Sequence, residues 1–98
     1  MLSEKMIKSK EIDELYKAVL LLKNLDEARR FFRDLLTREE IEEIAGRWQV
    51  VRMIDQGIPY RNIAEKTGVS TATITRVARW LKEGMGGYRL MLDRLASK

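Results

Sequence analysis

Apolar residues recur at helical spacing along most of the chain, and no stretch shows the alternation of a strand. The first periodic stretch predicts a helix from Glu11 to Lys23. This helix is apolar around much of its circumference, so it needs to be covered on more than one side. Asn24 and Glu27 have the spacing of a capping box and predict the start of a second, shorter helix. Residues 1–9 are polar and aperiodic, and we expect a flexible arm.

The third predicted helix has clear boundaries. Thr37 and Glu40 have the spacing of another capping box, so this helix is expected to begin near Arg38. Gly57, followed by Pro59, is expected to end it. Its inward-facing residues are predicted to be Ile41, Ile44, Ala45, Trp48, Val51 and Ile54.

The segment 58–83 contains the pattern of a helix-turn-helix. That motif needs a small residue where two helices cross, a turn residue free to adopt positive φ, and apolar residues that lock the helices together. Ala64 and Gly68 supply the first two, and Ser70 is expected to cap the second helix. The apolar lock is predicted to be Ile63, Val69, Ile74 and Val77. A last helix, at residues 88–96, completes an all-α helical bundle.

The amino-acid composition limits the kinds of catalytic and metal-binding site that this chain can form. The chain of 98 residues has no cysteine and no histidine, which excludes disulfides and most catalytic and transition-metal sites. We therefore expect no enzymatic activity, no cofactor and no metal ion. Four glutamates, at positions 39, 40, 42 and 43, could suggest a divalent cation, but acids at a helix start are typical of a solvated face. No apolar run is long enough to cross a bilayer, which predicts a cytoplasmic protein without a membrane partner.

Charge is distributed unevenly. Residues 58–98 contain eight basic and three acidic side chains, whereas residues 1–57 contain eleven basic and twelve acidic ones. A basic half on a near-neutral platform favours a polyanion as partner, although solvated surfaces also vary in charge. We therefore expect one domain of residues 10–98, in which residues 10–57 form a dimerisation platform and residues 58–83 bind DNA.

The second helix of the predicted motif has an outward face suited to duplex DNA. Its short hydroxyl and methyl groups can approach base edges, and its arginines can reach phosphates or guanine. Tyr60 and Arg61 are placed to contact the DNA backbone. Two alternatives stay open, since Arg76 could form an intrachain ion pair and Tyr60 could be a packing residue. The candidate DNA-binding residues are Tyr60, Arg61, Ser70, Thr71, Ala72, Thr75, Arg76 and Arg79.

These features predict a sequence-specific regulator of transcription that binds a double-stranded DNA operator. The alternative is a helical dimeric interaction module that docks on an acidic protein partner. A protein interface would favour aromatic anchors, and Thr71, Ala72 and Thr75 are small. DNA is therefore the favoured partner.

The segment from Leu35 to Leu95 also resembles a known family. LLTREEIEEIAGRWQVVRMIDQG, followed by the helix-turn-helix with its GVSTATITR, resembles the Trp repressor family, in particular its YerC/YecD type. The resemblance implies a repressor and an intertwined homodimer, in which the N-terminal helices of two chains interlace. That implication agrees with the excess of apolar surface on the first predicted helix.

The resemblance further implies a small-molecule effector site. In the family, tryptophan lies between two arginines with two threonines nearby, and the matching residues here are Thr37, Arg47, Thr73 and Arg76. However, Val77 replaces a small residue of the family, and Trp80 replaces a serine. We therefore expect that free tryptophan is not the effector. Trp48 is expected in the core, whereas Trp80 could lie at the core edge, fill the pocket or contact another subunit.

Overall fold

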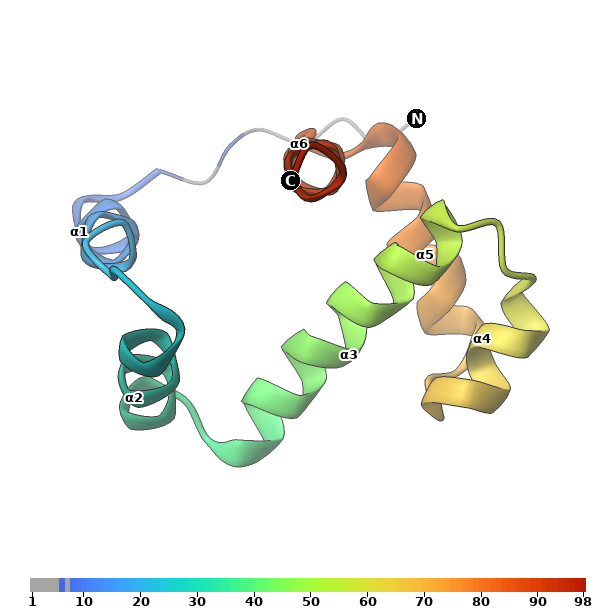
Figure 1. Cartoon of the computed structure of the whole chain (residues 1–98), viewed down its shortest axis with the longest axis horizontal. Helices are drawn as coiled ribbons and strands as arrows, with labels where there is room; N and C mark the ends of the chain where they lie inside the picture. The colour runs from blue at the N-terminus through green and yellow to red at the C-terminus, as the bar shows by residue number, and fades with distance from the viewer. Residues whose placement is uncertain (1–5, 7) are drawn as a thin grey trace. The chain divides into compact units, whose positions relative to one another are not determined.

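The computed structural model describes residue 6 and residues 8–98, so most of the expected arm at residues 1–9 lies outside the described residues. The described part of the chain is all-α, which confirms the predicted fold class. Its helices are α1 (Lys10–Val19), α2 (Leu25–Leu35), α3 (Arg38–Asp55), α4 (Tyr60–Thr67), α5 (Thr71–Glu83) and α6 (Gly87–Ala96) (Figure 1). No helix in this part of the chain is both long and apolar enough to span a membrane.

The chain divides into two compact units, an N-terminal unit that ends at residue 42 and a C-terminal unit of residues 43–98. Helix α3 contributes its first turn to the N-terminal unit and its remainder to the C-terminal unit. The predicted division into a dimerisation platform and a DNA-binding segment concerns function and stays a prediction.

In the N-terminal unit, α1 ends at Val19, so the predicted end at Lys23 is wrong. The reason is the capping box of α2. The Lys23 backbone N–H donates to Glu27 Oε1 at 3.0 Å, and the Glu27 N–H donates to Asn24 Oδ1 at 2.9 Å. Because the Lys23 N–H is bonded to α2, it does not continue α1, and the preceding leucines form a turn although their apolar pattern continues that of the helix.

The N-terminal unit has no fully buried side chain in either α1 or α2. Val19, Phe31 and Phe32 are half-buried. Leu20 is 82% exposed and Leu21 is 76% exposed. The apolar surface of these helices is therefore largely uncovered within one chain.

The C-terminal unit contains the hydrophobic core. Helix α4 packs on α5, and α5 contacts α6, as the yellow, orange and red helices of Figure 1 show. The core consists of Val50, Val51, Met53, Ile63, Ile74, Val77 and Leu92. These residues come from α3, α4, α5 and α6, so the last turns of α3 are the part that the other helices enclose.

This arrangement corrects the predicted inner face of α3. Ile44 is 53% exposed, and Ala45 is also exposed, so both predictions were wrong. Trp48 is half-buried at the edge of the core rather than inside it. Val50 and Met53 are buried instead, because the last turns of α3 are enclosed on several faces by α4, α5 and α6. Ile44 belongs to an earlier turn of α3, which these helices do not enclose.

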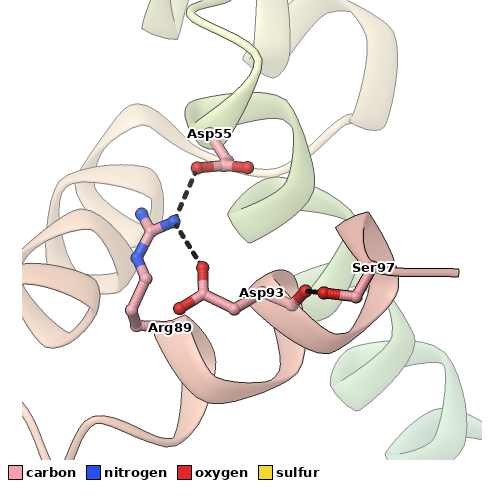
Figure 2. A network of polar contacts seen from close by, with 4 residues as sticks. All are labelled: Asp55, Arg89, Asp93 and Ser97. Atoms are coloured by element: carbon pink, nitrogen blue, oxygen red, sulfur yellow. Dashed lines mark hydrogen bonds and ion pairs between the residues drawn. The ribbon is translucent and has the colours of Figure 1, made fainter.

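Polar contacts join α6 to the end of α3. Arg89 Nη1 lies 3.1 Å from Asp55 Oδ1 and 3.6 Å from Asp93 Oδ1, and the Ser97 hydroxyl donates to the Asp93 carbonyl at 2.9 Å (Figure 2). Exposed ion pairs contribute little energy each. Their effect here is to give α6 a defined position against α3 in addition to its contact through the buried Leu92.

Candidate nucleic-acid interface and a neighbouring cavity

The turn between α4 and α5 has the predicted geometry. Gly68 has a φ of 76° in the left-handed region, and its N–H donates to the Ala64 carbonyl at 2.9 Å. Ser70 caps α5, because its Oγ accepts the Thr73 N–H at 3.2 Å. A glycine at this turn avoids the steric cost that a Cβ would meet at positive φ. The two helices are therefore joined by a short turn of defined conformation.

Thr67 is a further determinant of this turn that the sequence analysis missed. Its hydroxyl donates to the Ile63 carbonyl at 2.7 Å and accepts the Val69 N–H at 3.1 Å. A threonine directly before the turn glycine was the available signal, since threonine hydroxyls often bond to the carbonyl four residues earlier in a helix. The side chain of Thr67 thus supports the same conformation that Gly68 permits.

Helix α5 separates a buried face from an exposed face. Ile74, Val77 and Ala78 are buried, and Leu81 is half-buried, as the spacing predicted. The opposite face is exposed along its whole length: Thr71, Ala72, Thr75, Arg76, Arg79 and Lys82. The first half of this face is small and the second half is cationic, a distribution suited to contact with base edges and phosphates.

The hydroxyl groups of Ser70, which precedes α5, and of Thr75 within α5 are engaged within the chain. The Ser70 hydroxyl lies 3.0 Å from Thr73 Oγ1 as well as capping the helix. The Thr75 hydroxyl donates to the Thr71 carbonyl at 2.9 Å. A hydroxyl oxygen whose hydrogen is donated keeps its lone pairs as acceptors. Thr75 can therefore accept a hydrogen bond from a base amino group without losing its bond to the helix.

The arginines differ in their partners. Within the described part of the chain, Arg61 and Arg76 have neither an ion pair nor a side-chain hydrogen bond, so the intrachain pair considered for Arg76 does not form there. Arg79, in contrast, places Nε 3.4 Å from Glu83 Oε2. Arg61 and Arg76 are exposed cations that can bind an anion directly. Arg79 can do so only if its ion pair with Glu83 is weakened or broken.

A groove brings three of the predicted DNA-binding residues together. It has a volume of about 410 Å³ and is lined by Tyr60, Thr75, Ala78, Arg79, Lys82 and Glu83. Tyr60 contributes from the first turn of α4, and the other residues belong to α5. Lys82 and Glu83 were not among the predicted site residues, although Lys82 shares the outward stripe of α5 and Glu83 lies four residues after Arg79.

The four predicted effector residues do not line one cavity within a single chain. A cavity of about 500 Å³ in the C-terminal unit is lined by Ile44, Arg47, Trp48, Trp80, Met85, Gly87, Tyr88 and Met91. Of the four predicted residues, Arg47 alone lines it. Thr73 bonds to Ser70 instead, and Arg76 lies on the exposed face of α5. Thr37 belongs to the N-terminal unit, where it caps α3.

Aromatic side chains form much of the cavity wall. The rings of Trp48 and Tyr88 lie 6.3 Å apart with an angle of 33° between their planes. Trp80 is half-buried and lines the same cavity. Arg47 Nη2 lies 2.8 Å from Glu43 Oε1, so the one cation of the wall already has a carboxylate partner. The cavity is suited to an apolar body more than to a polar one.

The capping box that begins α3 is the site of a shifted pKa. The Thr37 N–H donates to Glu40 Oε1 at 2.9 Å, and the Glu40 N–H donates to Thr37 Oγ1 at 3.1 Å. The backbone hydrogen bond from Thr37, followed by its side-chain hydrogen bond, holds the pKa of Glu40 below its ordinary value of 4.5. The carboxylate is therefore the favoured form of this cap. In the described chain, no acidic residues gather in a way that could hold a metal ion.

Comparisons with known proteins agree with this geometry. Residues 10–96 match the model of the Trp repressor protein family. The chain is 46% identical over 89 residues to the uncharacterized protein YerC of Bacillus subtilis, an alignment that covers 91% of this chain and 86% of that protein.

Two solved structures have the same fold. A TrpR-like protein from Eubacterium eligens is 45% identical, with a TM-score of 0.88 over 91% of this chain and 92% of that one. A Trp repressor-like protein from Staphylococcus aureus is 43% identical, with a TM-score of 0.87 over 93% of this chain and 91% of that one. The matching family is one of DNA-binding regulators and not of enzymes. The chain therefore belongs to the Trp repressor family, as a TrpR-like protein of the YerC type.

Proposed function

We propose that this protein is a transcriptional repressor that binds a specific double-stranded DNA operator. The observation that carries the proposal is the exposed face of α5, with the small Thr71, Ala72 and Thr75 followed by Arg76 and Arg79. A helix of this kind enters the major groove with its small residues near base edges. The face contains no aromatic anchor, which favours DNA over the alternative of an acidic protein partner.

The same proposal includes a homodimer. Helices α1 and α2 have no buried residue, and Leu20 and Leu21 are among the most exposed apolar side chains of the described residues. In the C-terminal unit, Ile44 and Met91 are exposed beside the aromatic cavity. A second copy related by a two-fold axis has matching apolar surfaces to cover these groups. The two α5 helices of the dimer then read a near-palindrome with half-sites about one helical turn apart.

Selection from a random duplex library tests the proposal. The expected result is an enriched, near-palindromic motif at moderate salt, with half-site centres about 10 base pairs apart. As a control, the same selection is made with a Thr75→Leu variant. This variant should no longer enrich particular bases at the positions near residue 75, and it should retain its general affinity for duplex DNA. If the unaltered protein enriches no motif, or binds only non-duplex partners, the proposed function is wrong.

We further propose that free tryptophan is not the effector. Val77 is buried among core residues, Trp80 lines the cavity, and Arg47 is paired with Glu43. The carboxylate of a tryptophan ligand would therefore compete with Glu43 for Arg47, and its ring would share the cavity with the Trp80 side chain. Calorimetry with millimolar tryptophan should give no saturable heat, and operator binding should be independent of it. A saturable heat that Arg76→Ala abolishes, together with tighter operator binding, would contradict the proposal.

A further inference from the structure

The groove beside α5 combines phosphate-binding groups with one acid. Tyr60, Arg79 and Lys82 are hydrogen-bond donors of the kind that contact a DNA backbone. Glu83 lines the same groove, and its Oε2 lies 3.4 Å from Arg79 Nε. The two side chains are 56% exposed for Arg79 and 34% exposed for Glu83, so the pair lies where an approaching phosphate would meet it.

Helix stability does not account for a glutamate at this position. Glu83 is the last residue of α5, where the negative end of the helix dipole disfavours an acid. The order of the pair is also the weaker one, because an acid four residues before a base stabilises a helix better than the reverse. Glu43 and Arg47 show the favourable order on α3. The helix dipole and the order of the pair therefore both disfavour an acid at position 83.

An ion pair at the groove has a direct consequence for an anionic ligand. While Glu83 accepts a hydrogen bond from Nε, the charge of Arg79 is partly neutralised within the chain. A phosphate that approaches Arg79 must then compete with one carboxylate and is repelled by it. Arg61 and Arg76 have no such partner among the described residues, so the effect is confined to Arg79.

Resting on the proposed DNA-binding function, we propose that Glu83 limits the affinity of this protein for duplex DNA by holding Arg79 in an intrachain ion pair at the phosphate-binding groove. The effect acts on the electrostatic component of binding, which is common to all duplex sequences. Glu83 thus lowers the affinity for the operator and for other DNA by the same factor and weakens the sequestration of the protein on non-operator DNA.

The test compares Glu83→Gln with Glu65→Gln. Glutamine keeps the length of Glu83 and an oxygen that accepts from Arg79, and it removes the charge. Glu65 is an exposed residue of α4 outside the groove, so its substitution makes the same change in net charge elsewhere on the motif. Dissociation constants are measured for the selected operator and for a scrambled duplex over a range of salt concentrations, with thermal unfolding to show that both variants are folded.

Glu83→Gln should raise the affinity for both duplexes by the same factor, up to about eightfold per bound subunit near 0.1 M salt, because each additional phosphate contact steepens the dependence of log K on log salt by about 0.9. Glu65→Gln should change both affinities by less than about twofold. In an Arg79→Gln background, Glu83→Gln should give no larger gain than Glu65→Gln does, because only the direct repulsion by the carboxylate is then removed.

Four results would overturn the inference. Equal effects of the two glutamate variants, or a loss of affinity in Glu83→Gln, would do so and leave the proposed function intact. A full gain in the Arg79→Gln background would show that the ion pair is not the cause. Failure of the unaltered protein to bind any duplex would overturn both the inference and the proposed function.

Discussion

The six-membered ring of Trp80 lies against the backbone of Gly84. A Cβ placed on residue 84 would lie 2.6 Å from Cε3 of Trp80 and 2.5 Å from the Trp80 carbonyl oxygen, distances that real Cβ atoms do not adopt. The Gly84 N–H also donates to that carbonyl at 2.9 Å. The absence of a side chain at Gly84 therefore allows Trp80 to take the orientation in which it lines the aromatic cavity.

Gly84→Ala is expected to displace the Trp80 ring and to destabilise the protein by about 1–3 kcal/mol, the usual cost of a forced rearrangement in a packed site. Intrinsic tryptophan fluorescence should shift and the thermal midpoint should fall. Gly87→Ala is the matched control, because a Cβ at residue 87 meets nothing within 4 Å. Equal behaviour of the two variants would show that the Trp80–Gly84 contact has no energetic role.

The start of α3 should respond to pH through Glu40. Its pKa is lowered in the folded protein, so the cap contributes stability above the ordinary value of 4.5 and loses it as the pH falls through the lowered pKa. Glu40→Gln should therefore be less stable than the unaltered protein at neutral pH, and the difference should close in acid. Thermal unfolding at a series of pH values measures this. A constant difference across the series would contradict the prediction.

Removing the Thr37 hydroxyl should raise the Glu40 pKa only in part. The larger cause of the shift is the backbone hydrogen bond from Thr37, which Thr37→Ala retains, whereas the side-chain hydrogen bond is lost. A carboxyl-detected NMR titration should give a Glu40 pKa in Thr37→Ala between that of the unaltered protein and 4.5. A full return to 4.5 would show that the cap as a whole depends on the hydroxyl.

Thr75 and Arg61 should have separable effects on DNA binding. A bulky residue at Thr75 is expected to cost about 1–3 kcal/mol of discrimination between the operator and a mismatched site. Arg61→Ala should instead weaken binding to all sequences and reduce the salt slope by about one unit per bound subunit. Competition binding over a range of salt measures both effects. If Arg61→Ala changed the discrimination between the two sites and the substitution at Thr75 did not, the orientation proposed for the motif on DNA would be wrong.

The leucine turn after α1 should control self-association. Leu20 and Leu21 are exposed in one chain, and a charge placed there would be buried without a partner in a dimer that covers them. Leu20→Glu and Leu21→Glu should each weaken association about tenfold or more. Gln56→Glu adds the same charge at an exposed polar position and should leave association unchanged. Sedimentation equilibrium distinguishes these results, and full association in the leucine variants would contradict the prediction.

The features that sequence predicted best depend on short-range geometry. The capping residues Asn24, Thr37 and Ser70 act within three residues of their own position, and the positive φ of Gly68 follows from its local turn. The spacing of apolar residues likewise assigned the buried face of α5, because one periodicity holds along that helix. These interactions can be identified without knowledge of what lies across the core.

The incorrect predictions depend on contacts between distant residues or on competition between adjacent elements. The apolar pattern of the leucines continues that of α1. However, the Lys23 N–H donates to Glu27 Oε1, and the helix ends before Lys23. Ile44 has the right spacing for the core, yet the enclosing helices reach only later turns of α3. The predicted grouping of Arg47 with Thr73 and Arg76 came from a family resemblance and stays a prediction; within one chain, the cavity at Arg47 is lined by aromatic residues of other turns.

Helices α1 and α2 lack any interior of their own, so the folding of this part of the chain is thermodynamically linked to whatever covers it. When the cover is a second copy, stability becomes a function of total protein concentration, and the midpoint of unfolding rises as the protein accumulates. Dilution then removes structure and binding competence together. The fraction of the protein that is folded and able to bind would then increase with its concentration in the cell.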